Sequence, residues 1–201
     1  GVDSSTRIIF YASDPSKDQS QRYLTEKFLI KYFSHMKEYI LVIKTHPQDN
    51  GEITNYAYRD FDEPSNIVLI GDVAKESNIV SEQFMIFDDF DFNSALSSCN
   101  GFLTCSSSSI LQALMLGVKT GVVDKFNNGN YDYLYQQNAS MLIDGEESLT
   151  AFLENKKLPV SDEVLSFCGL KNGKKEFDVG GHLLKCLIEL DKDDEKRMVK
   201  E

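Results

Sequence analysis

The segment GFLTCSSSSILQALMLGVKTGVV, residues Gly101–Val123, decides the fold, because its hydrophobic pattern changes twice within a short distance. Gly101–Cys105 is a short apolar run, as in a buried strand. The serines Ser106–Ser109 and the apolar residues that follow at helical spacing predict a helix, which the serines cap and Gly117 ends. Lys119–Val123 is again a short apolar run. Strand, helix and strand in this order predict a βαβ unit with parallel strands.

The rest of the chain repeats this alternation. Further strands are predicted at residues 7–12, 39–45, 66–71 and 140–143, with a short extended piece in QFMIF, residues 83–87. Helices are predicted at residues 19–36, 53–58, 92–99, 131–137, 146–153 and 181–190. The strands are apolar throughout, which is typical of a parallel sheet covered by helices on both faces. We therefore expect a Rossmann-like α/β domain over residues 1–190 and a charged tail over residues 191–201.

Composition narrows the functions to consider. The chain has 201 residues and a net charge of −11, so we expect no nucleic-acid partner, because a phosphate-binding surface needs clustered Lys and Arg. No apolar segment reaches the ~20 residues of a membrane span, and no signal-peptide pattern is present. The chain begins almost directly on a strand, so we expect it to be part of a longer protein. Its four cysteines lack CxxC spacing, which predicts reduced, buried thiols in a cytoplasmic protein.

Ligands of parallel sheets bind at the carboxyl ends of the strands, near the point where the strand order reverses. Three segments are candidates for this edge: Ser13–Asp14, His46–Pro47 and Ser106–Ser109. The four serines combine hydroxyl groups with the unpaired N–H groups of a helix start, a combination suited to phosphate or carboxylate. The alternative is a helix cap with spare serines on a surface loop.

His46 follows the second predicted strand, and Pro47 fixes the direction in which the chain leaves it. The imidazole ring can hydrogen-bond a phosphate or, when protonated, act as an acid. The alternative is a strand-end histidine bonded to a backbone carbonyl. The neighbouring serines favour the phosphate-binding interpretation.

Several other functions lack their sequence signals. The first strand is followed by YASDPS without any glycine, so no GxGxxG motif indicates a nicotinamide or flavin enzyme. There is no GxSxG motif of a serine hydrolase and no metal-ligand spacing. We interpret the acidic segment Phe87–Asp91 as a solvated helix start, and His35 and His182 as structural. We expect neither a metal nor a cofactor.

Three segments resemble a known family. IKTHPQ, NIVLIGD and LSSCNGFLTCSSSSILQALMLGVKTGVV look like the C-terminal, donor-binding half of a GT-B glycosyltransferase. The resemblance is to bacterial enzymes of surface polysaccharide synthesis, which include the capsule and lipopolysaccharide Kdo transferases, sialyltransferases and glycerophosphate transferases of the teichoic-acid type. It covers most of this chain but about half of such an enzyme.

The resemblance implies a particular site and reaction. In the CMP-sugar members, a His-Pro pair and a Ser-Ser or Ser-Thr pair contact the nucleotide phosphate, so His46 would donate a proton or a hydrogen bond to the departing CMP. The implied nucleotide-binding set is Ser13, His46, Pro47, Ser106, Ser107, Ser108, Ser109 and Gln112. Many relatives carry a glutamate near the position of Gln112, where it binds the ribose, and an amide lacks that charge assistance.

The implied activity is transfer of a sugar from a CMP-activated donor, such as CMP-Kdo or CMP-sialic acid, to a glycan or lipid-linked acceptor. The expected location is the cytoplasm, with peripheral association at the inner face of the membrane. The catalytic base and acceptor site of such enzymes belong to an N-terminal domain that this chain lacks. Two alternatives stay open: an isomerase of the UDP-GlcNAc 2-epimerase kind, and a non-catalytic binding module that uses the aromatic loop Asn127–Tyr135.

Overall fold

The structure, a computed structural model, describes residues 5–14, 18–46, 52–61, 64–71, 84–86 and 92–155. All of them belong to one compact unit, Gly1–Pro159. The predicted helix at residues 181–190, the charged tail and the domain boundary at residue 190 lie outside the described residues. That boundary therefore stays a prediction.

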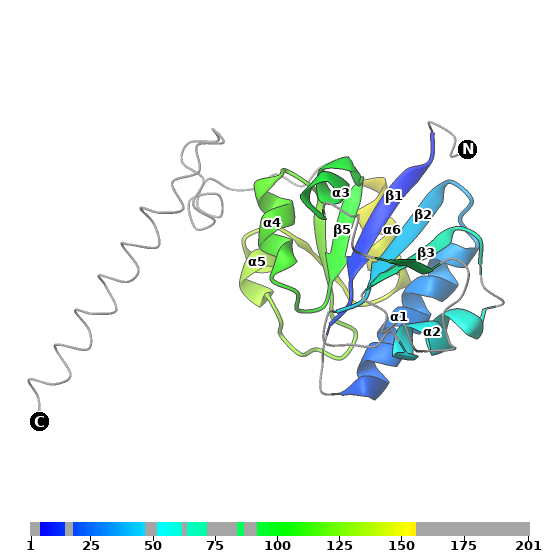
Figure 1. Ribbon diagram of the computed structural model, residues 1–201. Helices are drawn as coiled ribbons and strands as arrows, with labels where there is room; N and C mark the ends of the chain where they lie inside the picture. The colour runs from blue at the N-terminus through cyan, green and yellow to red at the C-terminus, as the bar shows by residue number, and fades with distance from the viewer. Residues whose placement is uncertain are drawn as a thin grey trace, which may run out of the picture. The chain divides into compact units, whose positions relative to one another are not determined.

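The centre of the fold is a parallel sheet of seven strands (Figure 1). The strands are β1 (Arg7–Ala12), β2 (Tyr39–Lys44), β3 (Ile67–Gly71), β4 (Phe84–Ile86), β5 (Gly101–Thr104), β6 (Thr120–Val123) and β7 (Met141–Ile143). Their order in the sheet is β4-β3-β2-β1-β5-β6-β7, and every neighbouring pair is parallel. The predicted fold class, a Rossmann-like parallel sheet flanked by helices, is confirmed.

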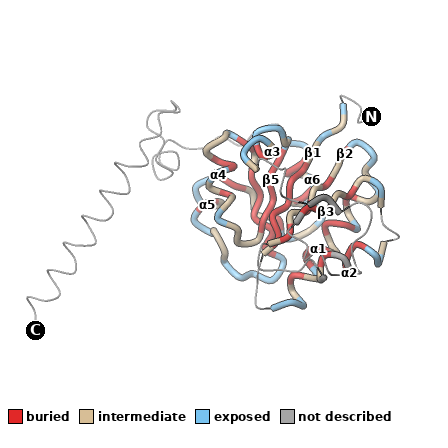
Figure 2. The backbone as a smooth tube through the Cα atoms, viewed as in Figure 1, coloured by how far each residue is buried: buried red, intermediate tan, exposed pale blue. Residues whose placement is uncertain are grey.

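Helices cover both faces of the sheet. They are α1 (Gln19–Ser34), α2 (Glu52–Arg59), α3 (Phe92–Ser98), α4 (Ser109–Met115), α5 (Asp132–Gln136) and α6 (Glu146–Glu154). Side chains of α1, α2 and α6 share one buried cluster with the odd-numbered residues of β1, β2 and β3. On the opposite face, Phe10 of β1 packs against Phe92 of α3, and Figure 1 shows α4 and α5 on that same side. The strands between these layers are buried, as Figure 2 shows.

The predicted elements within the described residues match the observed ones to within about two residues at their ends. Gly117 ends α4 as predicted, with a φ of +72°. The predicted capping of α4 by serines needs a correction. Ser108 occupies the cap position but makes no side-chain capping bond, and the hydroxyl of Ser107 instead accepts from the Ser109 N–H at 3.3 Å. No described helix has both the length and the apolar character needed to cross a membrane.

Two glycines let α6 lie close to the sheet. A Cβ atom on Gly101 would lie 2.9 Å from the Phe152 ring, and one on Gly121 would lie 3.3 Å from the same ring and 2.7 Å from Leu103. Glycine is needed where another group approaches the backbone this closely. The ring of Phe152 therefore rests on the backbone of β5 and β6, which fixes α6 against the sheet.

Candidate functional site

The carboxyl ends of the three central strands form one edge. The chain runs from β1 outward through β2, β3 and β4, and then returns to β5 on the other side of β1, so the strand order reverses between β1 and β5. Ala12, the last residue of β1, is level with the last residues of both β2 and β5. The structure therefore brings together the three predicted segments Ser13–Asp14, His46 and Ser106–Ser109. Two strand spacings of ~4.8 Å place the ends of β2 and β5 about 10 Å apart.

Ser13 is buried below this edge rather than open to a ligand. Its hydroxyl donates a hydrogen bond to Oε1 of Glu26 in α1, and its side chain is 2% exposed. A direct contact between this hydroxyl and a nucleotide would require that hydrogen bond to break. Asp14, the next residue, is half-buried and lies at the surface of the edge.

A buried ion pair supports the edge from below. Nε of Arg22 lies 3.0 Å from Oε1 of Glu26, and a second guanidinium nitrogen donates to the Thr54 hydroxyl of α2 at 3.1 Å. Glu26 is fully buried, and its Oε2 has no hydrogen-bond partner within the described part of the chain. We did not predict this pair from the sequence, although two opposite charges four residues apart on the buried face of a helix are a usable signal.

The serine turn is held by the loop that follows β6. The hydroxyl of Tyr131 donates to the Ser106 carbonyl at 2.9 Å. Tyr131 has a φ of 55°, a conformation that is costly for a bulky residue and persists only where surrounding contacts fix it. Ser108 is exposed, whereas Ser107 and Ser109 are half-buried. Ser108 is therefore the most accessible residue of the turn.

His46 and Gln112 occupy two sides of the same edge. His46 follows β2 by two residues and is half-buried, while Pro47 lies outside the described residues. Gln112 lies on the exposed face of α4, one turn after its start. We overlooked Lys44, which ends β2 and brings an ammonium group to this edge, with Nζ 3.4 Å from the Thr45 carbonyl. The sequence signal for Lys44 is its position two residues before His46, at the end of a predicted strand. The roles of these residues in binding stay predictions.

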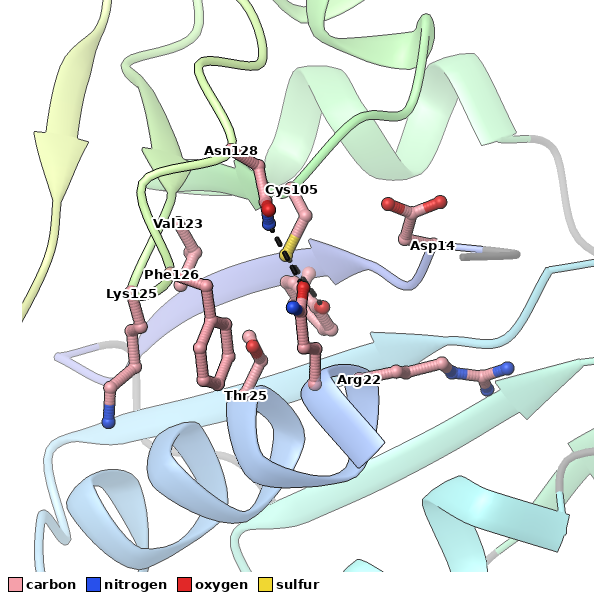
Figure 3. Close-up of a pocket in the computed structure, with 10 residues that line it drawn as sticks. Asp14, Arg22, Thr25, Cys105, Val123, Lys125, Phe126 and Asn128 are labelled. Carbon is pink, nitrogen blue, oxygen red and sulfur yellow. Dashed lines mark hydrogen bonds between the residues drawn. The ribbon is translucent and has the colours of Figure 1, made fainter. Parts of the chain in front are cut away.

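A pocket opens between the start of α1 and the loop after β6 (Figure 3). Its polar lining includes Tyr11, Asp14, Gln21, Cys105 and Asn128. Its volume of about 20 Å³ suits a water-sized group. A nucleotide would therefore lie across the mouth of this pocket rather than inside it.

The loop beside the pocket is organised by a buried carboxylate. Asp124 is 6% exposed, and its two oxygens accept from the N–H groups of Asn128 and Gly129, each at 2.8 Å. The Asn128 amide in turn donates to Gln21 of α1 at 3.2 Å. The sequence contained the Gly/Asn composition of a loop, but nothing in it paired this loop with α1.

One phenol and one thiol face each other at the base of the pocket. The hydroxyl of Tyr11 lies 3.5 Å from Sγ of Cys105. Burial raises the pKa of Cys105 to about 12 and holds the pKa of Tyr11 well above its ordinary value of 10.0. Burial is also the main cause of the raised pKa of Tyr131, and the negative charge of Asp14 adds to the rise in the pKa of both Cys105 and Tyr131. Both groups at the base of the pocket are therefore neutral at pH 7.

We expect Cys105 to resist thiol reagents in the folded protein. A rise in pKa from 9.0 to about 12 lowers the thiolate fraction at pH 8 about 1000-fold. Alkylation followed by peptide mapping should therefore find Cys105 at least 100-fold slower than a model thiol, and equally fast in guanidinium chloride. A rate within tenfold of the model thiol would contradict the buried, protonated state.

The other residues considered from the sequence take these places. His35 is exposed at the end of α1, where we expected a structural histidine. The acidic segment Phe87–Asp91 and His182 lie outside the described residues. Among the residues that are described, no group of three or more His, Cys, Asp or Glu side chains could hold a metal ion.

Comparison with known proteins gives a likeness in fold. No protein-family model matches the sequence, and no curated protein does. A UDP-GlcNAc 2-epimerase from Neisseria meningitidis, solved with UDP-GlcNAc bound, has a TM-score of 0.58 and 13% identity over 94% of this chain and 46% of its own. A putative UDP-N-acetylglucosamine 2-epimerase from Listeria monocytogenes has a TM-score of 0.52 and 11% identity over 96% and 46%. The wall teichoic acid polymerase TagF has a TM-score of 0.50 and 16% identity over 94% and 46%.

These likenesses define the class of fold. The chain has a Rossmann-like fold of the GT-B kind, shared with epimerases and with a polymerase. It spans about half the length of each of these proteins. At such low identity the likeness shows the fold alone, because one fold supports many activities.

Proposed function

We propose that this chain is the nucleotide-sugar-binding half of a GT-B enzyme, and that it takes a CMP-activated donor. The observation that carries the proposal is the common edge of β2, β1 and β5, where the strand ends that lead to His46 and to the Ser106–Ser109 turn lie about 10 Å apart. A phosphate between them would accept hydrogen bonds from the imidazole, the serine hydroxyls and those backbone N–H groups of the turn that remain, since the N–H groups of Ser107 and Ser109 already donate within the protein. The similar fold of a protein solved with UDP-GlcNAc supports a nucleotide-sugar ligand.

The proposed chemistry is displacement at the anomeric carbon of the sugar. The bond between that carbon and the phosphate oxygen breaks, and its electron pair stays on the phosphate of the departing CMP. His46 donates a hydrogen bond or a proton to this oxygen, and the serine turn stabilises the remaining charge. A second domain supplies the catalytic base and the acceptor site, at which a glycan or a lipid-linked acceptor binds.

In this proposal, Asp14 does not contact the phosphate. Its carboxylate lines the pocket at this edge, where it would repel a phosphate. A carboxylate is instead suited to accept hydrogen bonds from hydroxyl groups. We therefore infer that Asp14 contacts the ribose or the sugar, and that Gln112 has a minor part in holding the ribose.

Replacing His46 with alanine is expected to weaken CMP binding at least tenfold, because hydrogen bonds to charged groups contribute about 1.5–3 kcal/mol. Titration calorimetry with CMP measures the loss, and the same titration with cytidine is the internal control. Cytidine lacks the phosphate, so its affinity should be equal in both proteins.

His35→Ala is the matched control, since His35 is an exposed histidine at the far end of α1. It should leave CMP affinity unchanged. Equal CMP affinity in His46→Ala and the parent protein would remove the role proposed for His46. The same loss for cytidine as for CMP would do so too.

The second candidate function is that of a UDP-GlcNAc 2-epimerase-like isomerase. Two of the three similar structures described above are such epimerases, which favours this candidate as much as the transferase. Both candidates need a second domain, and they differ in the nucleobase of the nucleotide that is bound. Tighter binding of UDP than of CMP and CDP would favour the isomerase or a UDP-sugar transferase.

A non-catalytic binding module is the third candidate. It would use the aromatic loop Asn127–Tyr135, in which Tyr133 is 40% exposed. The hydrogen bond from Tyr131 to the Ser106 carbonyl argues against this candidate, because it fixes the loop beside the serine turn at the carboxyl-end edge of the sheet. In the first proposal, the transferase associates with the inner face of a membrane and takes part in surface polysaccharide synthesis.

A further inference from the structure

A second cavity lies at the opposite edge of the sheet. It has a volume of about 260 Å³ and is bounded by residues at the amino ends of β1, β2, β5 and β6 and by the end of α6. Its polar lining consists of Arg7, Tyr39, Asn100, Lys119, Glu154 and Asn155. The carboxyl-end site lies at the other end of the same strands, so the two sites share none of their residues.

Two cations face this cavity. Arg7 donates to the Tyr39 hydroxyl at 3.0 Å, and its guanidinium carbon lies 5.7 Å from the centre of the Tyr39 ring. The Lys119 ammonium donates to the carbonyls of Phe152 and Asn155 at the end of α6, at 2.5 and 2.6 Å. These bonds hold both cations in place at the walls of the cavity.

The two cations line the same cavity. Burial and the nearby charge of Arg7 lower the pKa of Lys119 to about 8. In the described part of the chain, no carboxylate forms an ion pair with either cation, although Glu154 also lines the cavity. The whole chain carries 32 acidic and 21 basic residues, so two neighbouring cations with no ion-paired carboxylate among the described residues run against its composition.

The cavity also contains hydrogen-bond donors that the fold does not use. The Tyr39 hydroxyl accepts from Arg7, so its own proton can point elsewhere. The side-chain oxygen of Asn100 accepts from the Ile8 N–H at 2.7 Å, which leaves its amide N–H groups for another partner. Donors from Arg7, Tyr39 and Asn100 in the field of Lys119 exceed what a planar carboxylate needs and suit the several oxygens of a phosphate.

We propose that this cavity binds the phosphate group of a small phosphorylated molecule, with Arg7 as the principal ligand and Tyr39 and Asn100 as hydrogen-bond donors. Its volume lies below the roughly 300–1,000 Å³ of drug-sized ligand pockets, so the ligand is a small one. The site is independent of the nucleotide edge and would exist even if the proposed transferase activity does not.

The experiment uses the full chain and inorganic phosphate as the probe, titrated at pH 7 and constant ionic strength. We expect saturable binding that Arg7→Met weakens at least tenfold. Lys31→Met removes the same charge from the exposed last turn of α1 and should have no effect. Arg7→Lys restores the charge without the forked geometry and should recover part of the affinity.

Two further measurements test which residues form the site and which anion it prefers. Tyr39→Phe removes one proposed donor from the cavity and should weaken phosphate binding, and acetate should bind at least tenfold more weakly than phosphate. Absence of saturable phosphate binding, or equal affinity in Arg7→Met, would overturn the proposal. Equal affinity for acetate would overturn its assignment to phosphate.

Discussion

Replacement of Arg22 with methionine is expected to lower the free energy of unfolding by about 3–5 kcal/mol. The substitution leaves the Glu26 carboxylate buried without its cation, and one oxygen of that carboxylate already has no hydrogen-bond partner among the described residues. The Thr54 hydroxyl loses its partner as well, so α1 and α2 lose a link. The charge that remains has no route to water, because Glu26 is fully buried.

Urea unfolding followed by circular dichroism measures this loss. Lys27→Met on the same helix is the matched control, because Lys27 pairs with Asp60 at the surface and surface pairs contribute little. Its midpoint should stay close to that of the parent protein. The double variant Arg22→Met/Glu26→Met should be more stable than Arg22→Met alone, since it removes the unpaired charge. A double variant that is less stable than the single one would contradict this account.

The second large effect is expected at Phe152. Truncation to alanine should destabilise the protein by about 3–5 kcal/mol, because it removes a fully buried ring and leaves a cavity beside two glycines that cannot fill it. Lys119 adds to the effect, since its ammonium lies 4.5 Å from the centre of this ring.

Thermal and urea unfolding of Phe152→Ala and Phe126→Ala provide the comparison. Phe126 is 37% exposed in the loop after β6, and its truncation should change the stability by about 0.5 kcal/mol or less. Phe152→Leu keeps part of the volume and should fall between the parent protein and Phe152→Ala. A loss below about 1 kcal/mol in Phe152→Ala would mean that α6 is not fixed to the sheet by this ring.

The strands and helices were predictable because their signals are local. Short apolar runs such as residues 9–12 and Gly101–Thr104 are buried on both faces, and such runs differ clearly from the helical spacing of Gln19–Ser34. The cap of α4 was less predictable. Four serines could each cap the helix, and the contact of Ser107 with the Ser109 N–H is settled by the path of the turn.

The candidate site was predictable only in outline. The rule for parallel sheets placed His46 and the serine turn at the same edge, because the carboxyl ends of parallel strands share one edge, whereas the position of β1 between β2 and β5 came from the structure. The burial of Ser13 beneath the edge was not predictable, since it depends on Glu26 in a helix that the sequence places only approximately. The same is true of Asp124 and its loop, which reach Gln21 across more than a hundred residues of chain.

The sequence by itself determined the class of fold and the position of the described strands and helices, and it predicted the edge at which a ligand would bind. These follow from the periodicity of neighbouring residues and from the chirality of the chain. The tertiary structure alone decided which polar groups are available at that edge and which are engaged inside the protein, such as the Ser13 hydroxyl. It also brought Arg7 and Lys119 to one cavity. Such pairings join residues far apart in the chain, and their energies depend on distance and burial, which no local pattern encodes.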